Sequence, residues 1–180
     1  GFKGLLLGSV SNHCLHHAPC PVAVIRHGAQ VDGSDGADAG PERVVVGVDG
    51  SPVAQRALRW AIDEARARGA RLDVVHAWSA PVVGGPFAIV AFEPTLAEQA
   101  ANEIVDRALA AEDTTGVDVQ RGVTCGAAAP ALLAAAQGAG LVVVGSRGRG
   151  GFQRLLLGSV SQQVAQHAPG PVVVVPPDGR

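Results

Sequence analysis

The chain has 180 residues, 47% of them hydrophobic, which is enough for one ordinary domain with a buried core and an additional segment. Its 14 basic residues are balanced by 16 acidic ones, so there is no electrostatic reason to expect a nucleic acid or an anionic membrane as a partner. Apolar runs are far shorter than a spanning helix needs, and no signal-peptide pattern opens the chain, so we expect a cytoplasmic protein.

The first 25 residues, GFKGLLLGSVSNHCLHHAPCPVAVI, recur near the other end of the chain as GFQRLLLGSVSQQVAQHAPGPVVVV, starting at Gly151. About 15 of these positions are identical without a gap, which chance does not produce. We therefore interpret residues 1–25 as the last helix and strand of an upstream sister domain, with the strand at 22–25. The absence of methionine also suggests a piece of a longer protein.

The segment that follows, RHGAQVDGSDGADAGPE at 26–42, is rich in glycine, aspartate and alanine. It has neither helical nor strand periodicity, which predicts a flexible linker. Residues 43–176 are then expected to form one complete domain.

The first half of this domain alternates between strands and helices. The β-branched run RVVVGV at 43–48 predicts a buried parallel strand, and RLDVVHAW at 71–78 predicts a second. Between them, Ser51 can cap a helix that Gly69 ends. A further helix is expected at 95–111, with one apolar face formed by Ala97, Ala100, Ala101, Ile104, Val105 and Ala108.

The second half continues the alternation. VDVQRGV at 117–123 has the pattern of an edge strand, a short helix is expected to open near Pro130, and LVVVG at 141–145 predicts a fourth strand. A helix at 159–167 and a last strand at 172–175 follow. Strict alternation with short connections requires right-handed crossovers, so the sequence predicts an α/β fold with a doubly wound parallel sheet and helices on both faces.

Two strand ends carry residues suited to ligand binding, which in such sheets occurs beyond the carboxyl ends of the strands where the strand order reverses. The first strand ends in GVDGS, which places Asp49 just past it, and the fourth ends in GSRGRGGFQRLLLGSVS. There, Gly158 and Ser159 open a helix whose N-terminal amides favour an anion. Backbone approach to a ligand is eased by Gly145, Gly148, Gly150 and Gly151. The pattern indicates a phosphate cradle, although neither GxxxxGK[ST] nor a strand followed by GxGxxG is present.

Together, GVDGS after the first strand, VHAW in the second, and the spacing G-x2-G-x9-GS that begins at Gly145 resemble the nucleotide-binding subgroup of the universal stress protein family. The resemblance covers 43–176, and 1–25 as a partial second copy. It implies an ATP-binding, often dimeric α/β domain with five parallel strands in the order 3-2-1-4-5.

Carried over position by position, the resemblance implies eight residues of an ATP site. Asp49 would meet the ribose or adenine side, Ala77 would offer its backbone to the adenine, and Gly47 and Val160 would line the same cleft. The ribose and phosphates would be held by Gly145, Gly148, Gly158 and Ser159. We expect a bulkier residue in place of Gly145 to occupy ligand space and abolish binding while leaving the fold largely intact.

Several of these positions have a purely structural alternative. Asp49 could be a turn or capping residue, and the glycines could form only a tight loop. Arg147, Arg149 and Arg154 could neutralise phosphates, yet arginines on loops are usually solvated. His76, within an apolar strand, is interpreted as a hydrogen-bonded core histidine rather than a catalytic residue.

Five potential metal ligands lie close together in the opening segment: His13, Cys14, His16, His17 and Cys20. Their counterparts in the second copy are Gln163, Val164, Gln166, His167 and Gly170, so the set is not repeated. We therefore expect no metal site. The three cysteines, without CxxC spacing, predict neither a disulfide framework nor a zinc site.

The last strand, 172–175, is wholly apolar and is expected at a sheet edge, which natural proteins rarely leave open. We expect it to pair antiparallel with 22–25 of the same chain or with the same strand of a second chain. The opening segment lacks counterparts of Asp49 and Gly145, so we expect it to bind no nucleotide itself.

Three functions remain open at this point. The favoured one is an ATP-binding regulatory module of the stress response, whose nucleotide biases a conformational or oligomeric state. A slow ATP hydrolase or phosphotransferase would need a general base or a carboxylate pair beside the cradle, and only Asp49 is available. A structural dimerisation domain that binds nothing would have no use for the glycine motif.

Overall fold

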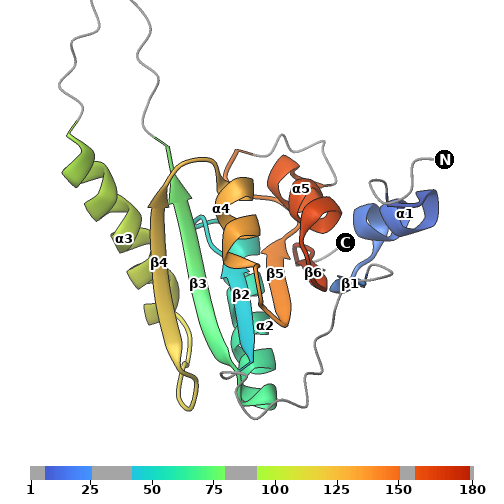
Figure 1. Ribbon diagram of the computed structural model, residues 1–180, viewed down its shortest axis with the longest axis horizontal. Helices are drawn as coiled ribbons and strands as arrows, with labels where there is room; N and C mark the ends of the chain where they lie inside the picture. The colour runs from blue at the N-terminus through green and yellow to red at the C-terminus, as the bar shows by residue number, and fades with distance from the viewer. Residues whose placement is uncertain (1–6, 26–41, 80–92, 151–156, 179–180) are drawn as a thin grey trace, which may run out of the picture.

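A computed structural model describes residues 7–25, 42–79, 93–150 and 157–178 (Figure 1). In these residues six strands form one sheet in the order β1-β6-β5-β2-β3-β4. The strands are β1 (Val22–Val24), β2 (Arg43–Gly47), β3 (Arg71–Trp78), β4 (Val119–Cys125), β5 (Leu141–Gly145) and β6 (Val172–Val175). The helices are α1 (Ser9–His17), α2 (Pro52–Arg68), α3 (Pro94–Ala110), α4 (Ala128–Ala135) and α5 (Ser159–His167).

The sheet is mixed: the five strands of residues 43–176 are parallel, and β1 of the opening segment adds a sixth. Neighbouring strands are parallel except for β1 and β6, which pair antiparallel with Val22 opposite Val174 and Val24 opposite Val172. The extra strand comes from the opening segment, and it covers the apolar edge of β6 within the same chain. The expected linker lies outside the described residues except for Glu42.

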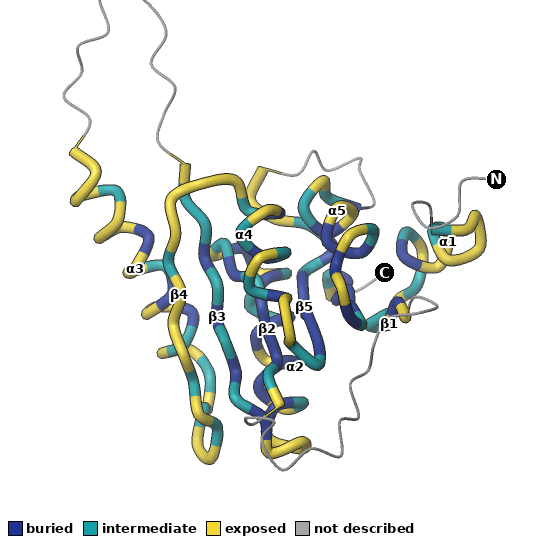
Figure 2. The backbone as a smooth tube through the Cα atoms, in the orientation of Figure 1, coloured by how far each residue is buried: buried dark blue, intermediate teal, exposed yellow. Residues whose placement is uncertain are grey.

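The core has two layers, one on each face of the sheet, as expected for an α/β fold. Helices α2 and α3 pack on one face, and α4 and α5 pack on the other, with Leu15 of α1 joining the second layer (Figure 1). Alternate residues of β2 point to opposite layers: Val44 and Val46 to the first and Val45 to the second, all fully buried. Burial on both faces explains why the central strands are unbroken valine runs (Figure 2).

The structure differs from the sequence prediction mainly where contacts between residues far apart in the sequence determine burial or strand bounds. The expected apolar face of α3 is buried only at Ala101, Val105 and Ala108, whereas Ala100 is exposed, because the first turns of the helix extend past the sheet (Figure 2). Strand β4 lies two residues later than predicted, since its pairing with β3 continues to Cys125.

Two smaller differences have local causes. Helix α4 begins at Ala128, so Pro130 lies in its first turn, where a backbone N–H would have no intrahelical partner and its loss costs little. Strand β1 ends at Val24, and Ile25 is exposed. No helix within the described residues is long and apolar enough to cross a membrane.

Helix α2 has both of the ends that the sequence predicts. The Ser51 hydroxyl accepts a hydrogen bond from the Ala54 amide (3.2 Å), and Pro52 occupies the first turn. At the other end Gly69 adopts a left-handed conformation (φ 62°) and its amide bonds back to the last turn. The Ser51 cap thus begins α2 immediately after the loop that follows β2.

We predict that Ser51→Ala lowers the free energy of unfolding by about 1 kcal/mol, because the Ala54 amide loses its capping acceptor. The matched control is Glu93→Ala at the N-cap of α3, where the side chain makes no capping hydrogen bond. Urea unfolding should show a change of less than about 0.5 kcal/mol for this control. Equal losses in the two variants would contradict the assigned cap.

Candidate functional site

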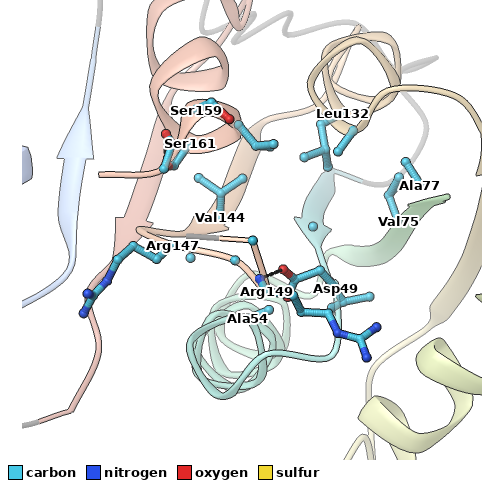
Figure 3. A pocket seen from close by; sticks show the side chains of 18 residues that line it. Asp49, Ala54, Val75, Ala77, Leu132, Val144, Arg147, Arg149, Ser159 and Ser161 are labelled. Atoms are coloured by element: carbon cyan, nitrogen blue, oxygen red, sulfur yellow. Dashed lines mark hydrogen bonds between the residues drawn. The ribbon is translucent and has the colours of Figure 1, made fainter. Parts of the chain in front are cut away.

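The carboxyl ends of β2, β3 and β5 border a pocket of about 460 Å³ (Figure 3). Strand β2 is the point at which the strand order reverses, since the chain proceeds from it to β3 and β4 on one side and later to β5 and β6 on the other. Loops that leave such neighbouring strands in opposite directions leave a crevice between them. The volume is typical of small-molecule sites.

All eight residues that the resemblance implies for an ATP site line this pocket. They come from the end of β2, the end of β3, the loop after β5 and the first turn of α5: Gly47, Asp49, Ala77, Gly145, Gly148, Gly158, Ser159 and Val160. Residues far apart in the sequence are thus brought together at one place.

The loop after β2 is held from several sides. The Val48 amide donates to the Val75 carbonyl of β3 (2.9 Å), and the His76 ring donates from Nδ1 to the Val48 carbonyl (2.7 Å). His76 is buried, which agrees with its interpretation as a core histidine. The Asp49 carboxylate follows directly and accepts two backbone hydrogen bonds, from Ser51 and Arg149. Asp49 therefore has the turn role that the sequence left open.

The start of α5 is anchored to the ends of β5 and β6 through Ser146. The Ser146 amide donates to the Val175 carbonyl (2.7 Å), and its carbonyl accepts from the Gly158 amide (2.7 Å) and the Ser161 hydroxyl (2.9 Å). The Ser161 hydroxyl also lies 2.9 Å from the Gly158 carbonyl. These bonds direct the N-terminus of α5 toward the pocket.

The first turn of α5 provides backbone donors at the pocket wall. The intrahelical ladder begins with Gln162 donating to the Gly158 carbonyl (3.0 Å), so the amides of Ser159, Val160 and Ser161 lie ahead of it. The partial positive charge of a helix N-terminus adds to these donors. This side of the pocket is therefore suited to an anion such as a phosphate.

The rest of the lining is largely apolar and includes residues that sequence reasoning missed: Val75, Ala128, Leu132 and Val144. In Figure 3, Val75 and Leu132 lie across the pocket from Ser159. Val75 could have been found, because it lies two residues before Ala77 on the same face of β3. Leu132 could not, because α4 is brought to the site only by the fold. A side chain at Gly47 would meet Leu132, with its Cβ 2.9 Å from Leu132 Cδ1. Glycine at this position lets Leu132 close the pocket floor.

Two of the three arginines considered as phosphate partners, Arg147 and Arg149, do not point into the pocket. In Figure 3 the side chains of Arg147 and Arg149 extend away from its centre in different directions. Arg154 lies outside the described residues, as does Gly151. The described part of the site thus presents backbone amides rather than guanidinium groups to an anion.

Of the histidines of the opening segment, His13 and His17 are exposed on α1 and His16 is half-buried. The rings of His13 and His17 stack with their centroids 4.3 Å apart. Within the described residues, no group of three or more His, Cys, Asp or Glu side chains could hold a metal ion.

The expected effect of a side chain at position 145 is corrected by the structure, although Gly145 itself lines the pocket. A Cβ added at Gly145 would lie 3.0 Å from Val53 Cγ1 and 3.2 Å from the Val53 carbonyl carbon and oxygen. It would therefore press on the first turn of α2 rather than fill the ligand space. Glycine is needed here because β5 and α2 approach each other closely, so a substitution would disturb the fold as well as the site.

A family model described as "Universal stress protein family" matches residues 1–26 and 41–176. The chain belongs to the universal stress protein family. This confirms the resemblance seen in the glycine motif. The match is interrupted between residues 26 and 41, directly after the first copy of the internal repeat.

Curated universal stress proteins are similar over nearly the whole chain. One from Mycolicibacterium smegmatis is 42% identical over 96% of this chain and 57% of its own length. Universal stress protein Rv2005c from Mycobacterium tuberculosis is 42% identical over 94% of this chain and 56% of its own length. The chain therefore spans little more than half of the length of these relatives.

Solved structures of universal stress proteins share the fold. One in complex with cAMP is 30% identical, with a TM-score of 0.53, over 76% of this chain and 98% of its own. A protein from Archaeoglobus fulgidus is 27% identical, with a TM-score of 0.60, over 96% of this chain and 55% of its own.

We predict that Gly145→Ala lowers the free energy of unfolding by about 1–3 kcal/mol, because the added methyl group overpacks the contact with Val53. Gly150→Ala is the matched control in the same loop region, since no described heavy atom lies within 4 Å of its added Cβ. Urea unfolding of both variants measures the difference. If Gly145→Ala unfolds with the same free energy as the unmodified protein, the contact between β5 and α2 is not as tight as described.

Proposed function

We propose that this universal stress protein domain binds ATP in the crevice at the ends of β2, β3 and β5, and acts as a nucleotide-dependent regulatory module of the stress response. The observation that carries the proposal is the combination of two walls in one pocket: helix-terminal amides on one side and apolar side chains on the other. Phosphates suit the first wall and a flat base suits the second. A cytoplasmic location is part of the same proposal.

The lining residues support an adenine nucleotide that is bound mainly by backbone groups of the protein. Ser159 and Val160 offer amides at the start of α5, while Ala77 lies at the end of β3 on the side of Val75 and Leu132. The related universal stress protein solved with cAMP, which contains the same base and sugar as ATP, supports this choice of ligand class.

The hydrogen bonds of Asp49 favour binding over rapid turnover. Asp49 is the only carboxylate among the described lining residues, and each of its oxygens already accepts a backbone hydrogen bond. Phosphoryl transfer needs groups that orient the nucleophile and neutralise the developing charge. We therefore propose a binding module, with slow ATP hydrolysis as the alternative that a turnover assay would reveal.

We also propose that residues 1–25 correspond to the end of an upstream universal stress protein domain, 26–42 to a linker, and 43–176 to a complete domain. The two-segment match to the family model and the greater length of the curated relatives support this division. The pairing of β1 with β6 would then correspond to a contact between the edge strands of two domains. The alternative is a homodimer in which β1 of one chain pairs with Val172–Val175 of the other in place of the pairing within one chain.

We predict that Ser159→Pro weakens ATP binding about tenfold, measured by isothermal titration calorimetry. Proline is compatible with the first helical position, and Gly158 before it is already extended (ψ 158°), so α5 should form while one amide donor disappears. Loss of one hydrogen bond to a charged group, about 1.5 kcal/mol or more, gives this magnitude.

Two controls separate the amide from other effects of this change. Ser159→Ala removes the hydroxyl but keeps the amide, and it should weaken binding clearly less. Ser9→Pro makes the same change at the first position of α1, outside the pocket, and should leave affinity unchanged. No detectable ATP affinity of the unmodified protein at millimolar concentration would refute the proposed function.

We further predict that affinity falls in the order ATP, ADP, AMP, adenosine. Each contact at a helix N-terminus contributes about 0.3–1 kcal/mol, so ATP should exceed AMP by no more than a few kcal/mol. Competition titrations at fixed ionic strength provide the measurement. Equal affinities for all four compounds would mean that the α5 terminus does not contact phosphate.

A further inference from the structure

We infer that Asp49 is a positioning residue: its carboxylate holds the loop 146–150 in place before any nucleotide arrives, and Gly148 is glycine because this carboxylate occupies the space of a side chain there. Only the consequence for nucleotide affinity rests on the proposed function. The holding contact itself is a property of the nucleotide-free protein.

The hydrogen bonds of Asp49 join the two loops that border the pocket. Oδ1 accepts from the Ser51 amide (2.9 Å) within the loop after β2, and Oδ2 accepts from the Arg149 amide (2.7 Å) in the loop after β5 (Figure 3). Hydrogen bonds to an ionised carboxylate are shorter and stronger than neutral ones. A single side chain thus fixes the distance between two segments that are 100 residues apart in the sequence.

The space around Gly148 shows the same contact from the other loop. A Cβ added there would overlap Asp49 Oδ2 and lie 3.4 Å from Asp49 Cγ. Backbone conformation does not explain the glycine, since Gly148 is not among the residues with positive φ. The reason for glycine at 148 thus differs from that at the neighbouring glycines. A Cβ added at Gly145 would meet Val53, and a Cβ added at Gly150 would meet no described atom within 4 Å.

A third contact supports the close approach of the loops. A Cβ added at Gly50, next to Asp49, would lie 3.9 Å from Arg149 Cζ and Nη1. The Arg149 side chain thus lies over the loop after β2 while its amide binds the carboxylate. If Asp49 acted only through direct contact with a nucleotide, neither the amide bond nor the glycine at 148 would follow from it.

A double-mutant cycle in nucleotide-free protein tests the inference, using D49A, G148A and the double variant D49A/G148A. With Asp49 present, G148A should lower the folding equilibrium constant about tenfold or more, because the new methyl group displaces the carboxylate. In the D49A background, G148A should lower the folding equilibrium constant less than threefold. Equal effects in the two backgrounds would overturn the inference.

Hydrogen exchange at the two amides gives a second and independent readout. Arg149 is exposed, so protection of its amide in the unmodified protein must come from the bond to Asp49 rather than from burial. The near-isosteric D49N places its carbonyl oxygen at only one of the two carboxylate oxygen positions and an NH2 donor, which cannot accept from an amide, at the other. At least one of the Ser51 and Arg149 amides should then exchange faster, and unchanged exchange at both would overturn the inference. This variant serves even where D49A does not fold.

ATP titration of the same variants separates this inference from the proposed function. If the unmodified protein binds no ATP, the proposed function fails, while the cycle and the exchange rates still decide the role of Asp49. If it binds ATP and the cycle is additive, the function stands and the holding role fails. Coupled stability together with weaker ATP binding by D49N is the result that we expect.

Discussion

The parallel pairing of β2 with β5 is the contact on which the other features depend. Val44 to Val46 lie opposite Leu141 to Val143, and both strands are buried on both faces. A shift of one residue would exchange the two core layers, so the register is strongly determined. Because the chain leaves β2 and β5 toward opposite faces of the sheet, a crevice opens at their carboxyl ends, and the pocket lies there.

Elements with strong local signals were predictable from the sequence alone. Ser51 and Gly69 bound α2 because a hydroxyl cap and a left-handed glycine act over only a few residues. The helix at 159–167 and the strands at 141–145 and 172–175 likewise have the predicted bounds. Predictions that depended on packing were less accurate: α3 extends past the sheet, so Ala100 is exposed in spite of its periodic spacing.

The candidate site shows the same division between local and distant information. The eight motif residues line one pocket because they follow strands or open a helix, and the fold class brings such positions together. Leu132 carries no local signal, since α4 reaches the site only through the crossover. The direction in which an added side chain would point is also invisible in the sequence, so the effect of substituting Gly145 was predicted wrongly: its Cβ would face Val53.

The covering of β6 by β1 has a consequence for how the protein behaves on dilution. Both strands belong to one chain and are joined through a connection that includes 26–41, so their pairing is a unimolecular event. A pairing within one chain does not depend on the protein concentration. An edge covered in this way stays closed at nanomolar protein, where a pairing between separate chains of modest affinity would dissociate and leave the valines of β6 free to recruit other strands.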